Sequence, residues 1–329
     1  MLADIVVGVQ HGDEAKGKIT HYLCKNKTYT HVLRFNGGCN AGHTIYHKGK
    51  KFITHHIPAG VFYGIKSIIG PGCVISPSQF FKELNELEQA GLSIENKIFI
   101  AGNAHVITDS HLEEENKETK IGTTKRGNGP AYRDKYARTG VQAKNVPELL
   151  PYVLDLYEEF HGDKTVKILC EGAQGYGLDI DWGDYPFVTS SHCGVAGALL
   201  NGIPHSWVRD VWGVAKVYET YVGSKQFEPF ENAEFFESLR REGEEYGATT
   251  GRPRQCNYLN LDELEKATKI NDVNKLVLNK VDILRKLDTW RLFSKGQLMT
   301  FSSESEMTSY VENVFNNVEV YFSDNKYKL

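Results

Sequence analysis

The segment that most restricts the fold is an apolar run, residues 5–9 (I-V-V-G-V), followed by a glycine-containing turn and a helix-compatible stretch, residues 18–24. The turn, residues 12–18, reads G-D-E-A-K-G-K. A buried strand that ends in a glycine turn at the start of a helix is the basic unit of α/β proteins. Free backbone N–H groups and the helix dipole at such a turn favour an anion. The segment therefore predicts an α/β fold with a phosphate site after the first strand.

The turn matches the phosphate-loop pattern G-x-x-x-x-G-K only in part. Ile19 stands where that pattern has a Ser or Thr whose hydroxyl binds the metal ion. Asp13 is the nearest carboxylate able to bind the metal instead, or to act as a base. From this segment alone, a tight turn with solvated charged side chains remains an alternative.

Further apolar runs along the chain alternate with helical patterns. The predicted strands are residues 5–9, 30–34, 67–69, 98–101, 166–170, 211–216 and 275–279, and the helical patterns are residues 77–90, 147–160, 231–246 and 262–270. This alternation predicts a large, mostly parallel central sheet flanked by helices. We expect a single domain over residues 1–329, similar to phosphate-loop NTPases, with residues 109–125 as a charged surface excursion.

Composition narrows the class of protein. A net charge of −4 argues against a nucleic-acid surface or a polybasic membrane anchor. No apolar run approaches the roughly 20 residues that a membrane helix needs, and the first residues lack the features of a signal peptide. Six cysteines without a C-x-x-C pair are typical of reduced thiols. We expect a cytoplasmic protein, in the host cytoplasm if the source is viral.

Several glycine- and hydroxyl-rich segments follow the predicted strands, where ligands bind in open α/β sheets. They are residues 37–44 (G-G-C-N-A-G-H-T), 121–132 (I-G-T-T-K-R-G-N-G-P-A-Y), 171–175 (E-G-A-Q-G), 185–191 (Y-P-F-V-T-S-S) and 247–254 (G-A-T-T-G-R-P-R). Such segments can present N–H and O–H donors, and Arg forks, to phosphate or carboxylate groups. Each alone is also compatible with an ordinary turn.

Residues 279–282 read N-K-V-D at the end of a predicted strand. This is the pattern of guanine recognition, in which a carboxylate accepts hydrogen bonds from N1–H and the 2-amino group of the base. Four residues are a weak signal alone, but the phosphate-type loop upstream strengthens it.

The ordered set of motifs resembles the adenylosuccinate synthetase family, particularly its compact archaeal and viral members. The resemblance spans residues 5 to about 285. It implies a homodimeric carbon–nitrogen ligase of purine biosynthesis that joins L-aspartate to IMP through 6-phosphoryl-IMP. The products are adenylosuccinate, GDP and phosphate. GTP is the co-substrate, and one Mg²⁺ is expected in each active site.

The resemblance also implies roles for individual residues. The catalytic residues would be Asp13, Lys16, His43 and Gln174, with Asp13 taking the N1 proton of IMP. Mg²⁺ would be held by Asp13 and the Gly42 carbonyl. IMP would be held by Asn40, Thr123, Thr124, Gln174, Thr189 and Arg138, the last from the neighbouring subunit. Aspartate would be bound by Thr249, Thr250, Arg252 and Arg254. GTP would be bound by Gly12, Glu14, Ala15, Lys16, Gly17, Lys18, Gly42, His43, Thr44, Lys280 and Asp282.

Two departures from the family pattern bear on function. Ala15 stands where the family usually has Gly, which is a tolerable change unless the backbone there needs a positive φ. The family's C-terminal Ser-x-Gly-Pro element, which encloses guanine, has no clear counterpart, and residues 323–325 (S-D-N) are the only candidate.

Three other functions remain as alternatives. A phage-type relative would make 2-aminoadenylosuccinate from dGMP with ATP or dATP, but such relatives typically replace the catalytic Asp, and Asp13 is present. A GTP-binding switch without ligation would leave residues 37–44, 171–175 and 247–254 unexplained. A ligase similar to dethiobiotin synthetase would have Ser or Thr in place of Ile19.

Overall fold

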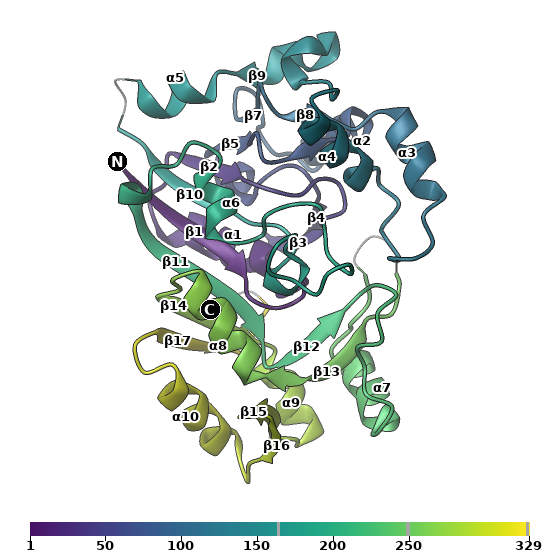
Figure 1. Ribbon diagram of the computed structural model, residues 1–329. Helices are drawn as coiled ribbons and strands as arrows, with labels where there is room; N and C mark the ends of the chain where they lie inside the picture. Colours follow the sequence, from purple (N-terminus) through teal and green to yellow (C-terminus); the bar gives the residue numbers. More distant parts are fainter. Residues whose placement is uncertain (163–164, 248–250, 327–328) are drawn as a thin grey trace.

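The computed structural model describes residues 1–162, 165–247, 251–326 and 329. Within them, a nine-stranded sheet crosses the molecule, and every neighbouring pair of its strands is parallel (Figure 1). In order across the sheet, the strands are β17 (Glu319–Ser323), β14 (Lys275–Asn279), β11 (Val208–Lys216), β1 (Leu2–Gly8), β10 (Lys167–Glu171), β2 (His31–Arg34), β5 (Lys66–Ile69), β7 (Ile98–Ala101) and β9 (Val153–Leu154). The prediction of a large, mostly parallel central sheet is confirmed.

The central strands are buried along almost their whole length, as expected for a parallel sheet with both faces covered. In β1, every residue from Ala3 to Gly8 is buried. Val6 pairs with Glu171 of β10, and Gly8 pairs with Val214 of β11. This register brings the carboxyl ends of the three strands to the same edge.

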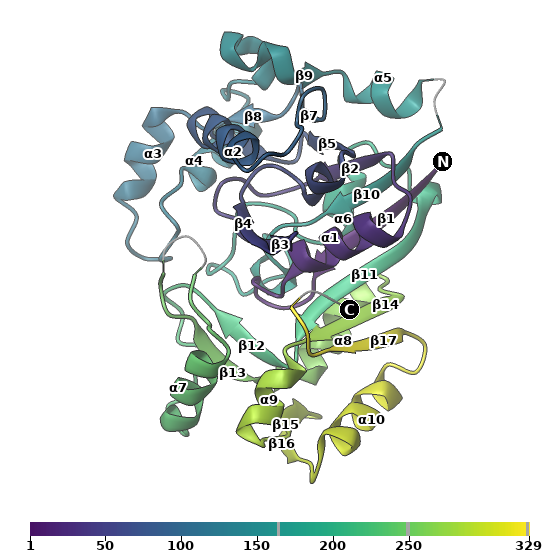
Figure 2. The same cartoon turned by 180° about the vertical axis from the view of Figure 1, so that it is seen from behind.

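Helices cover both faces of the sheet: α1 lies in front of β1 in Figure 2, and α8 lies in front of the sheet in Figure 1. The α-helices are α1 (Lys16–Asn26), α2 (Pro77–Gln89), α3 (Asp109–Asn116), α4 (Asn128–Ala137), α5 (Leu156–His161), α6 (Val195–Leu199), α7 (Ala233–Glu242), α8 (Leu261–Ile270), α9 (Val281–Leu287) and α10 (Glu304–Val314). Short 3₁₀ helices are η1 (Ala59–Tyr63), η2 (Ala143–Asn145), η3 (Pro147–Tyr152), η4 (Tyr176–Leu178) and η5 (His205–Trp207). None of the helices in the described ranges is long and apolar enough to span a membrane.

Smaller sheets complete the fold, and the sequence patterns did not predict them. A four-stranded sheet has the order β12 (Tyr218–Tyr221), β13 (Gln255–Asn260), β15 (Arg291–Ser294) and β16 (Gln297–Thr300). Two-stranded sheets join β3 (His43–His47) to β4 (Lys50–Thr54), and β6 (Val74–Ile75) to β8 (His105–Val106). One buried apolar cluster contains Val7 and Ala215 of the large sheet together with Cys256 and Leu292 of the four-stranded sheet. The two sheets therefore share a core.

The prediction of one helix over residues 147–160 is wrong. This stretch contains η3, strand β9 and the start of α5. Pro151 lies inside η3, and proline removes a backbone donor that a continuous helix would need. Asp155 then begins α5 as its N-cap, because its side chain accepts hydrogen bonds from the backbone N–H groups of Tyr157 and Glu158.

Two segments expected to lie outside regular structure are helical in part. In residues 121–132, helix α4 begins at Asn128, after Gly127 takes a left-handed backbone with φ 77°. In residues 109–125, helix α3 begins at Asp109. Thr108 and His111 form a capping box at its start, which satisfies its first N–H groups.

Candidate active site

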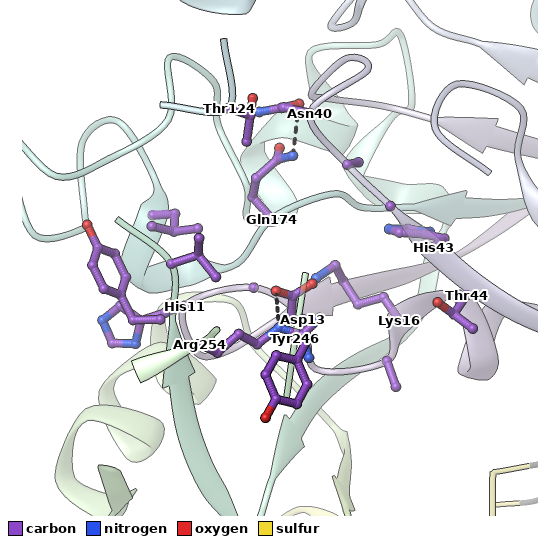
Figure 3. Close-up of a pocket in the computed structure, with 18 of the residues that line it drawn as sticks. His11, Asp13, Lys16, Asn40, His43, Thr44, Thr124, Gln174, Tyr246 and Arg254 are labelled. Carbon is purple, nitrogen blue, oxygen red and sulfur yellow. Dashed lines mark hydrogen bonds and ion pairs between the residues drawn. The ribbon is translucent and has the colours of Figure 1, made fainter. Parts of the chain in front are cut away.

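A pocket of about 1010 Å³ lies at the carboxyl edge of the large sheet. Its walls come from the segments that follow β1, β2, β10, β14 and β17, together with parts of the smaller sheets (Figure 3). Most of the predicted site residues line it: Gly12, Asp13, Ala15, Lys16, Gly17, Lys18, Asn40, Gly42, His43, Thr44, Thr123, Thr124, Gln174, Thr189, Arg254, Lys280 and Asp282. The parallel topology brings these distant segments together, because it places all the strand ends on one edge.

The loop between β1 and α1 is folded around a buried carboxylate. Glu14 is fully buried, and its Oε1 accepts hydrogen bonds from the backbone N–H groups of Gln10 (3.3 Å) and Gly12 (2.8 Å). Lys16 Nζ lies 2.5 Å from Glu14 Oε2. Glu14 was expected to bind GTP, but its side chain is enclosed by the loop and does not line the pocket. Its carboxylate stabilises the turn instead.

The proposed base Asp13 faces an arginine. Asp13 Oδ2 lies 2.9 Å from Arg254 Nε, and Figure 3 shows the two side chains meeting in the pocket. Arg254 is itself held by Glu245, whose Oε2 is 2.5 Å from its guanidinium. A residue expected to bind aspartate is thus placed beside the residue expected to act as base.

His43 belongs to a buried cluster of charged residues. Its Nδ1 lies 2.6 Å from Glu171 Oε1, and Arg34 Nη2 lies 2.7 Å from the same oxygen. Burial and the nearby Arg34 charge lower the pKa of His43 to about 4, so the ring is neutral at pH 7. Burial alone would raise the pKa of Glu171, but Arg34 and His43 outweigh it and hold that pKa at about 2. Because the ionised carboxylate can only accept, Nδ1 carries the ring hydrogen, and Nε2 accepts a hydrogen bond from Arg34 Nη1 at 3.3 Å.

Polar side chains that can hold a nucleobase gather at one end of the pocket. Gln174 Nε2 donates to Asn40 Oδ1 at 3.1 Å, and Thr124 lies next to this pair in Figure 3. Gln174 takes a left-handed backbone with φ 56°, which places its amide at the turn after β10. Thr123 and Thr189 line the same pocket.

The N-K-V-D segment lies at another part of the wall. Lys280 Nζ donates to the Gly243 carbonyl at 2.7 Å, and Asp282 lies in the first turn of α9. Residues 323–326, at the end of β17, also line the pocket. The C-terminal segment named as the only candidate for enclosing guanine therefore lies beside the N-K-V-D segment.

Lys18 was expected to bind phosphate, but its amino group contacts other protein groups. Its Nζ donates to Asn279 Oδ1 at 2.7 Å and to Ser323 Oγ at 2.6 Å. Burial lowers the pKa of Lys18 to about 8, although nearby carboxylates oppose that shift. The side chain ties the start of α1 to the ends of β14 and β17.

Four further predicted residues either do not line the pocket or lie outside the described residues. Arg138 is exposed at the C-cap of α4, and Arg252 Nη1 donates to the Gly122 carbonyl at 3.2 Å, so neither lines the pocket. Thr249 and Thr250 lie outside the described residues.

The structure adds charged residues that the sequence motifs did not assign to the site. Arg34 and Glu171 orient His43, while Glu245 and Lys216 lie behind Arg254. Arg34 and Lys216 end predicted apolar runs, and Glu171 directly follows one. A charged residue at the end of a buried strand was the signal available.

A group of potential metal ligands, Asp179, Asp181 and His192, does not line the pocket. Asp179 already accepts hydrogen bonds from the backbone N–H groups of Asp181, Trp182 and Cys193. Its carboxylate therefore has a structural role in the turn.

A parallel sheet with a glycine loop at a helix start, an N-K-V-D segment and a carboxylate facing an arginine defines a nucleotide-binding α/β enzyme. Comparison with known proteins is more specific. The adenylosuccinate synthetase family matches residues 5–149 and 142–325. The adenylosuccinate synthetase of Picrophilus torridus is 42% identical over 87% of this chain and 78% of its own length, and that of Thermodesulfovibrio yellowstonii is 38% identical over 85% and 77%.

Solved structures agree with this assignment. The fully ligated adenylosuccinate synthetase of Plasmodium falciparum superposes with a TM-score of 0.85 at 27% identity, covering 98% of this chain and 97% of that one. The succinoaminodeoxyadenylate synthetase of cyanophage S-2L, bound to dGMP and dATP, gives a TM-score of 0.78 at 21% identity, covering 99% and 93%, and shows the fold alone. The chain belongs to the adenylosuccinate synthetase family. It is a carbon–nitrogen ligase of the kind that joins L-aspartate to IMP with GTP as phosphoryl donor.

Proposed function

We propose that this pocket carries out the ligation in two steps, with Asp13 as the base. Asp13 takes the N1 proton of IMP, so that O6 attacks the γ-phosphorus of GTP and GDP leaves. The amino group of L-aspartate then attacks C6 of 6-phosphoryl-IMP, and phosphate leaves to give adenylosuccinate. Phosphorylation makes O6 a good leaving group, which it is not in IMP itself.

The observation that carries this proposal is the position of Asp13 between the other predicted groups. It lines one pocket with Lys16, His43 and Gln174, and its carboxylate contacts Arg254. Phosphoryl transfer depends mainly on positioning and on neutralising charge. The N-terminus of α1 supplies positive potential at the loop, where the Lys16 charge is paired with Glu14, and Arg254 lies where it can bind an aspartate carboxylate.

We assign His43 to the transferring phosphoryl group. Its ring is neutral before nucleotide binds, and Glu171 keeps it oriented through Nδ1. A phosphate oxygen beside the ring raises its proton affinity, because an opposite charge favours the protonated form. The imidazolium then donates a hydrogen bond from Nε2 to that oxygen, in place of the bond that Nε2 accepts from Arg34.

Mg²⁺ fits the residues of the pocket. The Asp13 side chain keeps 37% of its surface exposed, and Gly42 lines the same pocket, so that a carboxylate and a carbonyl oxygen are offered to a hard cation. When bound, the ion would neutralise charge on the phosphate oxygens.

The remaining assignments follow the walls of the pocket. Asn40, Thr123, Thr124, Gln174 and Thr189 would hold IMP, while Thr249, Thr250, Arg252 and Arg254 would capture aspartate. Gly12, Ala15, Gly17, Gly42, Thr44 and Lys280 would bind GTP, and Asp282 would read guanine. We further propose that residues 1–329 form a single domain and that the protein is cytoplasmic, in keeping with its six free cysteines. We also propose that it is a homodimer in which Arg138 reaches the partner's pocket.

Replacing Asp13 with Asn tests the role of the base. Asn keeps the side-chain shape and tolerates the left-handed backbone of this position, φ 59°, but cannot take the proton. We expect kcat to fall on the order of 10³-fold, as for loss of a general base, while binding of a non-hydrolysable GTP analogue changes little.

The matched control is Asp184→Asn, because Asp184 pairs with His11 and Lys225 and does not line the pocket. Its turnover should stay close to that of the wild type. Wild-type turnover by Asp13→Asn, measured as adenylosuccinate formation, would remove Asp13 from the mechanism.

A further inference from the structure

A buried polar cluster lies next to Arg254 and does not line the pocket. It consists of Lys216, Tyr218 and Glu245, which have exposed fractions of 1%, 2% and 0%. Glu245 Oε1 accepts from the Tyr218 hydroxyl at 2.6 Å, and Oε2 lies 3.2 Å from Lys216 Nζ. Fully buried charges are rare unless they are paired, so the charged groups of this cluster depend on one another for stability.

Glu245 holds Arg254 by its side chain and by its main chain. The carboxylate contacts the guanidinium at 2.5 Å, and the Glu245 carbonyl accepts a hydrogen bond from the Arg254 N–H at 3.0 Å. Next to them, Tyr246 forms a β-bridge with Pro253, and the Gly247 N–H donates to the Arg252 carbonyl at 2.8 Å. The two ends of the segment 247–254 are therefore fastened together, with Glu245 at the base.

The same cluster is connected to the loop that carries Asp13. Gln10 Oε1 accepts from the Lys216 N–H at 2.9 Å, and Gln10 Nε2 donates to the Lys216 carbonyl at 3.0 Å. The Gln10 N–H in turn donates to Glu14 inside the loop. Asp13 and Arg254 are thus positioned by one continuous set of hydrogen bonds.

The charges make Glu245 difficult to replace. Burial alone would raise its pKa, but Lys216 and Arg254 outweigh burial and lower the pKa to about 2. The carboxylate is therefore ionised throughout the working pH range. Without its charge, the ammonium of Lys216 and the guanidinium of Arg254 would face each other in a buried site, and like charges at short distance repel.

We propose that Glu245 is a positioning residue for aspartate capture: from outside the pocket it fixes the guanidinium of Arg254 in the place where the substrate carboxylate arrives. This inference rests on the proposed ligase function and on the assignment of Arg254 to aspartate. Glu245 does not line the pocket and touches no substrate in this arrangement. Lys216 and Tyr218 hold Glu245 in turn.

The variant Glu245→Gln tests the proposal. It keeps the side-chain shape but removes the charge that holds Arg254. We expect the KM for aspartate to rise on the order of 10-fold or more, and by a larger factor than kcat falls, while the KM values for IMP and GTP change less than about 3-fold. The matched control is Glu83→Gln, because Glu83 is equally buried but bonds to the backbone of His56 and Ile57, away from the pocket. Its KM for aspartate should not change.

A double-mutant cycle with Arg254→Ala separates positioning from a general structural effect. If Glu245 acts through Arg254, Glu245→Gln adds little to the aspartate KM once Arg254 is Ala. If the two substitutions instead raise the aspartate KM by independent factors that multiply in the double variant, the proposal is wrong. An unchanged aspartate KM in Glu245→Gln would also overturn it.

If Glu245→Gln does not fold, Tyr218→Phe removes one hydrogen bond to Glu245 and leaves every charge in place. We expect a rise of roughly 3-fold in the aspartate KM, and no rise would contradict the proposal. Failure of the underlying function has a different signature, because the wild-type enzyme would then form no adenylosuccinate at all.

Discussion

Two non-glycine residues of the loop after β1 adopt a left-handed backbone, Asp13 with φ 59° and Ala15 with φ 74°. Asp visits this region more readily than most residues, since its short polar side chain can bond locally. Ala has no such compensation. Because the backbone at Ala15 has a positive φ, Ala is a costly substitute for the Gly that the family usually has there. Such strain clusters at functional sites, where the surrounding structure enforces it.

Replacing Ala15 with Gly should therefore stabilise the protein. We expect the free energy of unfolding to rise by about 1 kcal/mol, because the left-handed backbone costs an L-residue roughly 1–2 kcal/mol and Gly loses part of that gain through its greater freedom in the unfolded chain. Urea unfolding measures the change. Ala267→Gly inside helix α8 is the opposite-sign control, with an expected loss of at least about 1 kcal/mol. An equal or lower stability of Ala15→Gly would show that this position carries no strain.

At the level of single residues, the motifs could predict which side chains come together where a motif itself forms the wall of the pocket, while the roles of these residues stay predictions. Asp13, Lys16, His43 and Gln174 all line the pocket, as their motifs implied. The motifs did not indicate partners that are set by tertiary packing. Glu171 orients His43, and Lys18 bonds to Asn279 and Ser323. These contacts form because strands distant in the sequence meet in the fold, and no local sequence pattern indicates which strands meet.

At the level of elements, the buried parallel strands were the most predictable. The runs at residues 98–101 and 275–279 coincide with β7 and β14, because strands covered on both faces are continuously apolar. The four-stranded sheet was missed, since β12 pairs with β13 across more than thirty residues and neither strand has a continuous apolar run. Helix α4 was missed because its glycines and proline are typical of loops.

The ends of β14 and β17 together form the wall that we assign to the guanine base, and Asp282 is the residue that tests this. In Asp282→Asn the carboxylate that accepts from N1–H and the 2-amino group is lost. We expect the KM for GTP to rise roughly 10- to 100-fold, the worth of a charged hydrogen-bonding pair. The same variant should gain activity with XTP, whose 2-oxo group accepts from the new amide N–H.

Asp288→Asn on the same helix is the control, because Asp288 is the exposed C-cap of α9. It should leave donor preference unchanged. If Asp282→Asn kept the wild-type preference for GTP over ATP, the guanine assignment would be wrong.

At the level of the whole molecule, the parallel sheet explains how motifs spread over residues 5–325 form one site. The carboxyl ends of the parallel strands lie on the same edge, so the motifs that follow β1, β2, β10 and β14 reach the pocket directly. Arg138 is among the predicted residues that do not line the pocket of their own chain, and its side chain is exposed. That position suits a residue that serves a second copy.

Mixing two inactive variants tests the proposed dimer. Asp13→Asn and Arg138→Leu should each be nearly inactive alone, but each mixed dimer contains one site with both residues intact. After equal mixing and subunit exchange, half of the dimers are mixed, so about a quarter of wild-type activity should return. Asp13→Asn mixed with His43→Asn is the control, since both residues belong to the same site and no intact site can form. Absence of recovery in the first mixture would contradict a shared site.

The most direct test of the central claim is a substrate comparison with the wild-type enzyme. Aspartate-dependent phosphate release is measured with IMP or dGMP, each with GTP, ATP or dATP, and the product is identified by mass. We predict adenylosuccinate formation, with kcat/KM highest for IMP and GTP and at least about 100-fold lower for dGMP, because the relatives that use dGMP typically replace the catalytic Asp, and Asp13 is present in this pocket. Faster turnover of dGMP with ATP or dATP, or phosphate release that does not depend on aspartate, would contradict the account.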